Sequence, residues 1–363
     1  MTRSPFGRLG GRASSVQWAS LIGLSVVLVV MAEMAHLPAA LLLGPMVAAI
    51  VIGVAEGTIR VSPYPFIAAQ AVIGCMIGHS VPLSIFAELM HDWPIFLTGV
   101  TTVIAASSLI GWLLTRWRFL PGTTAIWGTS PGASTAMILM SESYGADIRL
   151  VALMQYLRIV CVVVVATLVA TLWTANSGRP TTTIVWFPPI VWGSFLGTLA
   201  FIAACAIIST RVRVPGGQFL FPLFGGMLLQ EAGLLNITLP PWLLALSYAV
   251  VGWSIGLRFN RAILIHAFRA LPSIFAFTFV LIAVCGGVAG VLVFAAGIDP
   301  LTAYLATSPG GVDSIAIIAV TSNADLQFVM AMQTARMLVV LLTSTAIARF
   351  LIKRSGVVPA PPR

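Results

Sequence analysis

The sequence predicts an all-α polytopic membrane protein, with about ten transmembrane helices, two re-entrant or broken helical hairpins and two inverted repeats. Three observations support this fold class. Of 363 residues, 59% are hydrophobic and only 8% are charged, whereas soluble domains carry about 25% charged residues. Long apolar segments recur along the chain, and a long stretch of the first half reappears in the second. Most apolar side chains are therefore expected to face lipid.

The duplication is visible without a gap in the alignment. The segment AIWGTSPGASTAMILMSESYGADIRLVALMQYLRIVCV at 125–162 recurs 178 positions later, at 303–340, as AYLATSPGGVDSIAIIAVTSNADLQFVMAMQTARMLVV. A shared register of Pro, Gly, Asp, Gln and Arg indicates a repeated structural unit. The same offset pairs Thr-Ser-Pro-Gly at 129–132 with 307–310, Gln155 with Gln333, Arg158 with Arg336, Gly74 with Gly252, and Gly78 with Gly256.

Apolar segments of transmembrane length predict five spans in each half. An additional segment in each half is interrupted by Pro-Gly, at about 122–144 and 300–322. The predicted domains are a cytoplasmic tail at 1–15, membrane repeat 1 at 16–175, membrane repeat 2 at 182–352 and a cytoplasmic tail at 353–363. The spans are expected near 16–35, 37–54, 62–79, 93–115, 149–173, 184–209, 214–230, 238–257, 271–296 and 327–350.

Loop charge indicates whether the interrupted segments cross the membrane. If each one returns to its own side, nearly all basic loop residues face the cytoplasm. If both cross, Arg258, Arg261 and Arg269 move outside, against the positive-inside rule. We therefore expect five crossings and one re-entrant hairpin in each half. Because five is odd, the second half enters from the opposite side, so the repeats are inverted and both termini are cytoplasmic.

The Thr-Ser-Pro-Gly motifs predict helix breaks. Proline lacks an amide hydrogen and glycine permits unusual backbone angles. Inside a membrane such a break persists only where protein or a water-filled cavity covers it. A half-helix beginning after the break can attract an anion to its free amides; the alternative is a simple proline kink. Two motifs in register favour a substrate site, with predicted binding residues Thr129, Ser130, Pro131, Gly132, Thr307, Ser308, Pro309 and Gly310.

Each arginine of the repeated stretch lies about eleven residues into its helix, roughly 16 Å along the axis. At the bilayer centre an arginine costs at least about 2.5–3.5 kcal/mol. Arg158 and Arg336 can therefore bind the carbonyls of the neighbouring broken hairpin, contact the substrate, or snorkel from a shorter helix; the first two roles are compatible. Gln155 and Gln333 lie one turn earlier on the same face, and all four residues are predicted to bind substrate.

Three acidic residues accompany these motifs. Asp147 and Asp325 directly precede the Gln-Arg helices and are predicted to cap them, with ion coordination as the alternative. Asp313 follows the second break, and Thr135 occupies the matching position in the first half. This asymmetry predicts an ion-coupling residue, or an aspartate that interacts with the helix dipole. The four histidines lack helical i, i+4 pairs, so neither a metal nor a cofactor is expected.

The pair GTSPGASTAMILMSESYGADIRLVALMQYLR and ATSPGGVDSIAIIAVTSNADLQFVMAMQTAR resembles the duplicated module of the bacterial AbrB-type membrane protein family, over about residues 16–352. The family commonly has Ser-Pro-Gly-Gly at the break; here the first copy has Ala133 and the second keeps Gly311. Members are named as ammonia monooxygenases or transcriptional regulators and are associated with regulation of gene expression. The resemblance implies a bacterial inner-membrane location. By fold-level analogy the layout is also similar to elevator-type transporters.

From these features we expect a secondary active transporter of a small anion or carboxylate, coupled to protons or sodium, with an alternating-access site at the two breaks. The alternative is a membrane-embedded ligand sensor or regulator that affects gene expression without transport. An enzyme is not expected, because no nucleophile–base pair or metal cluster is recognisable. Expected partners are membrane lipid and a small anionic substrate, with a homodimer as the candidate assembly. Nucleic acid is not an expected partner, because the basic residues are scattered in short loops.

Overall fold

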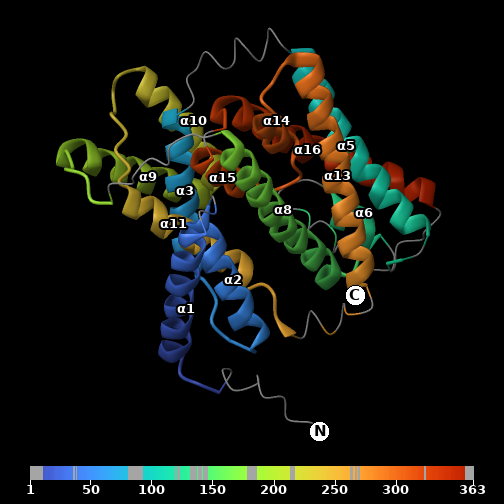
Figure 1. The fold of residues 1–363 in the computed structure, drawn as a ribbon, viewed down its shortest axis with the longest axis horizontal. Helices are drawn as coiled ribbons and strands as arrows, with labels where there is room; N and C mark the ends of the chain where they lie inside the picture. Colours follow the sequence, from blue (N-terminus) through green and yellow to red (C-terminus); the bar gives the residue numbers. More distant parts are fainter. Residues whose placement is uncertain are drawn as a thin grey trace. The chain divides into compact units, whose positions relative to one another are not determined.

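All regular structure in the described part of the chain is helical (Figure 1). Five of these helices are long and apolar enough to cross a membrane: α1 (Ser14–Met34), α5 (Trp93–Arg116), the Ile148–Trp173 part of α8 (Ile148–Ser177), α9 (Trp192–Val212) and α13 (Leu271–Ala296). The computed structural model describes residues 11–35, 37, 39–80, 93–117, 119–120, 123–130, 137, 141, 146–177, 186–212, 217–261, 265, 268, 270–322 and 324–355.

The other helices are α2 (Ala40–Val54), α3 (Pro63–Ser80), α6 (Thr124–Thr129), α10 (Gly217–Glu231), α11 (Pro241–Gly256), α14 (Pro300–Thr307), α15 (Val312–Thr321) and α16 (Leu326–Ser355). Of these, α2 and α11 are apolar but have only 15 and 16 residues. At 1.5 Å per residue they extend about 22–24 Å, less than the roughly 30 Å hydrocarbon core of a bilayer. Helices therefore form at the predicted spans, whereas ten membrane crossings remain a prediction.

One predicted boundary is wrong. The span expected at 184–209 is helical only from Trp192, and the described residues before it are not helical. Pro188 and Pro189 lie in this segment. Proline removes an amide donor and disfavours helical angles in the residue before it, so the helix begins after the pair.

Helix positions follow the offset found in the sequence. The first residues of α1 and α9, α3 and α11, α5 and α13, and α8 and α16 are each 178 residues apart, at Ser14 and Trp192, Pro63 and Pro241, Trp93 and Leu271, and Ile148 and Leu326. In both halves a short helix, α6 or α14, ends at the Thr-Ser of the motif.

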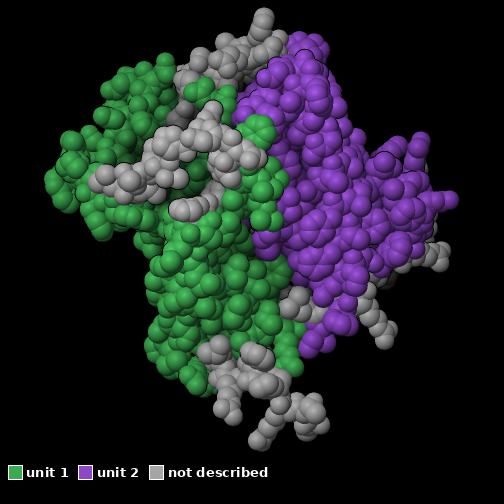
Figure 2. Space-filling model, in the orientation of Figure 1, with its two compact units in different colours: residues 1–87, 167–261, 316–327 green, residues 88–166, 262–315, 328–363 purple. Residues whose placement is uncertain are grey.

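The chain forms two compact units, each built from both halves of the sequence (Figure 2). Unit 1 comprises residues 1–87, 167–261 and 316–327, and unit 2 comprises residues 88–166, 262–315 and 328–363. Unit 1 thus contains α1, α2 and α3 of the first half and α9, α10 and α11 of the second. Unit 2 contains the fourth helix of each half, both Thr-Ser-Pro-Gly motifs and both Gln-Arg pairs. The compact units are therefore not the two sequence halves.

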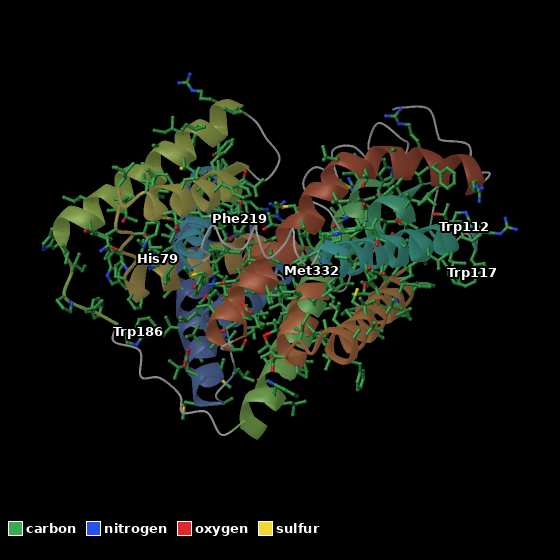
Figure 3. The ribbon with its side chains drawn as sticks, turned by 90° about the horizontal axis from the view of Figure 1, so that it is seen from above. His79, Trp112, Trp117, Trp186, Phe219 and Met332 are labelled. Carbon is green, nitrogen blue, oxygen red and sulfur yellow. The ribbon has the colours of Figure 1, made fainter. Side chains whose placement is uncertain are left out.

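In unit 1, α3 packs on α10 and α11 packs on α2. Glycines lie at both crossings. A Cβ atom at Gly74 would overlap the carbonyl oxygen of Phe219, a residue labelled in Figure 3, and one at Gly252 would lie 2.8 Å from the carbonyl oxygen of Leu42. The backbones meet directly at these positions, as small residues allow in membrane proteins. The repeated Gly-x-x-x-Gly pattern therefore acts as a helix-packing device.

One end of unit 1 brings together three chain segments. At the start of α1, the Gln17 side-chain oxygen accepts a hydrogen bond from the Thr58 backbone amide at 2.9 Å. In the same α2–α3 loop, Glu56 forms a 2.8 Å salt bridge with Arg261, which follows α11. Both side chains are nearly half exposed (43% and 45%), so the pair contributes at most about 1 kcal/mol. Together the two contacts show that the start of α1, the α2–α3 loop and the end of α11 lie at the same end of unit 1.

Unit 2 is held together by close packing around its broken helices. Helix α5 packs on α6 and α13, and α13 packs on α14. A Cβ atom at Gly99 of α5 would overlap the Met332 side chain of α16, which is labelled in Figure 3. Trp127 of α6 is fully enclosed in a cluster with Val151 of α8 and Ala348 of α16. These contacts fix both Gln-Arg helices against the short helices that end at the motifs.

Candidate functional site

The second Thr-Ser-Pro-Gly motif forms the predicted helix break. Asp299 caps α14 by accepting a 3.1 Å hydrogen bond from the Thr302 amide. The helix stops at Thr307, and α15 begins at Val312. Pro309 lacks an amide hydrogen, so it cannot continue the hydrogen bonding of α14. The break therefore leaves carbonyl groups at the end of α14 that need other partners.

Gln333 and Arg336 supply those partners. The Gln333 amide nitrogen donates to the carbonyl oxygens of Leu305 at 2.7 Å and Ser308 at 3.1 Å. Arg336 donates to the carbonyls of Ser308 at 2.5 Å and Gly310 at 2.9 Å, and to the Gln333 side-chain oxygen at 2.6 Å. Gln333 also donates to the Ala306 carbonyl at 3.3 Å, so one glutamine–arginine pair holds four carbonyls around the break.

The first motif is held in the same way. The Gln155 amide nitrogen donates to the carbonyls of Trp127 at 2.9 Å and Ser130 at 3.0 Å. Arg158 donates to the Thr129 and Ser130 carbonyls at 3.3 and 3.0 Å, and to the Gln155 side-chain oxygen at 2.9 Å. The predicted binding residues Pro131 and Gly132 lie outside the described residues. Apart from the bond to the Thr129 carbonyl, the described contacts match those of the second copy.

Both arginines are deeply buried. Arg158 and Arg336 are each 4% exposed, and Gln155 and Gln333 are 0% exposed. Snorkelling to the surface is therefore wrong for this structure, and the bonds to broken-helix carbonyls are those of the first alternative. These carbonyls carry the partial negative charge of a helix C-terminus, so they compensate part of each positive charge.

Within the described part of the chain, no acidic side chain forms a salt bridge with Arg158 or Arg336. The one salt bridge in this part joins Glu56 and Arg261 in unit 1. The Nε atoms of Arg158 and Arg336 are buried without a hydrogen-bond partner. A buried cation without a counter-ion is costly in a low-dielectric interior, and the helix carbonyls compensate each positive charge only in part.

The hydroxyl groups of the motifs bond to their own helices, and their predicted contact with substrate stays a prediction. Thr129 donates to the Ala125 carbonyl at 2.9 Å, Thr307 to the Ala303 carbonyl at 2.9 Å, and Ser308 to the Leu305 carbonyl at 2.9 Å. Hydroxyls that bond back to the preceding helical turn compete with the backbone hydrogen bonds and often bend a helix, which suits residues at a helix end. In this conformation the three hydroxyls bond to the last turns of α6 and α14.

The predicted acidic residues occupy helix starts. Asp147 Oδ1 accepts hydrogen bonds from the amides of Arg149 and Leu150 at 2.9 and 3.2 Å, the geometry of an N-cap of α8. Asp325 occupies the equivalent place before α16. Asp313 lies in the first turn of α15 and accepts from the Ser314 amide at 2.9 Å. Its counterpart Thr135 lies outside the described residues.

Sequence reasoning missed one neighbour of the site, Cys285 of α13. Its carbonyl accepts a 3.1 Å hydrogen bond from the Thr307 hydroxyl, and its thiol is fully buried. The glycines after Cys285 gave no signal for this contact, because a Cβ atom at Gly286 or Gly287 would have no neighbour within 4 Å. Among the described residues no group of three His, Cys, Asp or Glu side chains is arranged to hold a metal ion.

Replacing Gln333 with alanine should loosen the second break. The change removes the donor to the Leu305 and Ser308 carbonyls and the acceptor for Arg336. Leaving such buried groups unsatisfied costs about 1–3 kcal/mol, so thermal unfolding in detergent should occur several degrees lower. Gln230→Ala, in unit 1 and only partly buried, serves as the control. Unchanged stability of Gln333→Ala would contradict the assigned role.

These features define a multi-pass helical membrane protein with two buried glutamine–arginine pairs at helix breaks. A family model described as "Transition state regulatory protein AbrB" matches residues 41–352, and the chain belongs to this AbrB family. The protein "Putative regulator AbrB" of Escherichia coli (strain K12) is 45% identical over 337 residues, which cover 93% of this chain and 97% of that protein. "Uncharacterized protein YhjN" of Bacillus subtilis (strain 168) is 27% identical over 290 residues, or 75% and 74% of the two chains. The resemblance noted in the sequence is thus confirmed.

Proposed function

We propose that the protein is a secondary active transporter of a small anion or carboxylate, with its substrate site at the two helix breaks. The observation that carries the proposal is the pair of buried arginines, Arg158 and Arg336, each fixed beside a break by a glutamine. Structural bonds to helix carbonyls leave their formal positive charge in place. Ionisable residues inside a membrane commonly mark substrate or ion pathways.

The contacts at one end of unit 1 support an inverted-repeat topology. The Glu56–Arg261 salt bridge joins the α2–α3 loop to the end of α11. If every long helix between these points crosses the membrane and the first interrupted segment is re-entrant, the number of crossings is even and both ends lie on the same side. A full crossing by that segment would separate them. Inverted repeats with broken helices are a recurring design of secondary transporters.

Cysteine labelling tests this topology. Thr58→Cys and Arg261→Cys, made in separate variants, should both react with a membrane-impermeant maleimide from the cytoplasmic side and not from the periplasmic side. The four native cysteines are buried, which keeps the background low. The unsubstituted protein is the control for that background. Labelling of position 261 from the periplasm would refute the inverted arrangement.

The division into units supports a transport core and a scaffold. Both motifs and both glutamine–arginine pairs belong to unit 2. Unit 1 is built around close glycine-mediated helix crossings, which suit a rigid support. In the proposal, unit 2 carries the substrate and Asp313, at the start of α15, is the candidate site for proton or sodium coupling.

The decisive test is flux through the purified protein in proteoliposomes. Small mono- and dicarboxylates and inorganic anions should be screened as radiolabelled or fluorescence-reported substrates, with imposed sodium and pH gradients. Saturable uptake that depends on protein supports transport, and dependence on one gradient identifies the coupling ion. The printed name of the Escherichia coli relative speaks of a regulator. A sensor would bind an anion without net flux, so binding without uptake would favour that alternative.

A further inference from the structure

We propose that the two glutamine–arginine pairs form one site for one small divalent anion, such as a dicarboxylate or an inorganic dianion. The inference rests on the proposed function and specifies its substrate class. It requires that the second break lies against the helix that carries Arg158, that both positive charges act on the same space, and that donors remain available there.

The first requirement follows from a contact between the two halves of the sequence inside unit 2. Arg336 donates to the Gly310 carbonyl at 2.9 Å. A Cβ atom at Gly310 would lie 3.0 Å from the Val162 side chain of α8. Val162 lies four residues after Arg158, about one helical turn or 6 Å along the axis. The break held by Arg336 therefore packs against the face of α8 that carries Arg158.

The second requirement is met around Cys285. Its carbonyl is bonded to Thr307 at the end of α14. The Cys285 thiol lies within electrostatic range of both guanidinium groups, and Arg158 lies within electrostatic range of Arg336. Arg158 and Arg336 are therefore close enough for their charges to act on the same part of unit 2.

The two unpartnered N–H groups and the two formal positive charges of the arginines indicate which kind of ligand fits the site. Each arginine retains a buried Nε–H without a partner. A monovalent anion would leave one of the two formal charges uncompensated, whereas a dianion compensates both. Because the site is buried, an uncompensated charge is expensive. Two negative charges on one small molecule therefore match the site better than one charge does.

Binding to the purified full-length protein tests the inference, with succinate and sulfate as dianions and butyrate and chloride as monoanions. Calorimetry should give one dianion per chain, succinate and sulfate should compete, and butyrate should bind at least about tenfold more weakly, as expected for loss of one charge-assisted hydrogen bond. Lowering the pH through the second ionisation of succinate should weaken its binding and leave sulfate binding unchanged. This comparison uses the unaltered protein and does not depend on the folding of a variant.

A charge variant supplies the matched comparison. Arg158→Gln should reduce succinate affinity at least about tenfold and change butyrate affinity less. The exposed Arg149 of the same helix provides the control, Arg149→Gln. Butyrate binding as tight as that of succinate, or two anions per chain, would overturn the shared dianion site and leave the transporter proposal standing. If none of the four anions binds, the proposed function itself fails.

Discussion

Replacing either Arg158 or Arg336 with alanine is expected to lower anion uptake in proteoliposomes at least about 100-fold, while the protein still inserts in the membrane. Arg336 makes three hydrogen bonds at the second break, to the Ser308 and Gly310 carbonyls and to Gln333. Hydrogen bonds to charged groups contribute about 1.5–3 kcal/mol each. The loss of two such bonds from the substrate-bound protein is enough to lower uptake about 100-fold.

Exposed arginines on the same two helices are the controls. Arg149 lies on α8 and Arg349 on α16, and both are exposed, so their alanine variants should transport normally. Arg336→Lys should also transport poorly, because an ammonium group retains the charge but cannot reproduce the planar fork that meets two carbonyls. Insertion is checked by membrane yield and gel filtration. Full transport by both alanine variants would remove the arginines from the mechanism.

Replacing Gly78 or Gly256 with valine is expected to destabilise unit 1 by at least about 3 kcal/mol, or to prevent recovery of a monodisperse protein. A Cβ atom at Gly78 would overlap the Leu223 carbonyl, and one at Gly256 would overlap the Met46 carbonyl. These neighbours are helix backbone, which cannot move aside by a change of rotamer. Relief therefore requires the whole helix pair to separate.

Thermal unfolding and gel filtration in detergent measure this effect. Gly23 of α1 is the matched control in the same unit, because a Cβ atom there would have no neighbour within 4 Å. Gly23→Val should change the unfolding free energy by no more than about 0.5 kcal/mol. Equal stability of the Gly23 and Gly78 variants would show that the glycines are not needed for close packing.

Much of the fold could be predicted because its signals are local. Apolar length predicted where helices form, and Pro309 predicted the end of α14. The 178-residue offset predicted which helices correspond. The depth of Arg158 and Arg336 in their helices predicted burial, and both are 4% exposed. Where local signals were overlooked, as at Pro188 and Pro189, the predicted start of α9 was wrong.

The roles of the site residues were less predictable. From the sequence, several partners were possible for Arg158 and Arg336. The Thr129, Thr307 and Ser308 hydroxyls were predicted to bind substrate. In the structure these hydroxyls donate to carbonyls of their own helices. Nothing in the residue types distinguishes these outcomes, because a hydroxyl at a helix end can bond backward or outward with similar energy.

By itself the sequence determined the class of protein, the repeated unit, the positions of the breaks and the residues with unusual chemistry. All of these depend on composition and on neighbours within a few helical turns. The tertiary structure alone decided that each arginine binds the carbonyls of a break, that the Cys285 carbonyl accepts a hydrogen bond from Thr307 at the second break, and that each compact unit combines both halves. These features depend on which distant segments meet, and in an apolar chain many pairs of helices could pack equally well until glycine contacts and buried polar bonds select one arrangement.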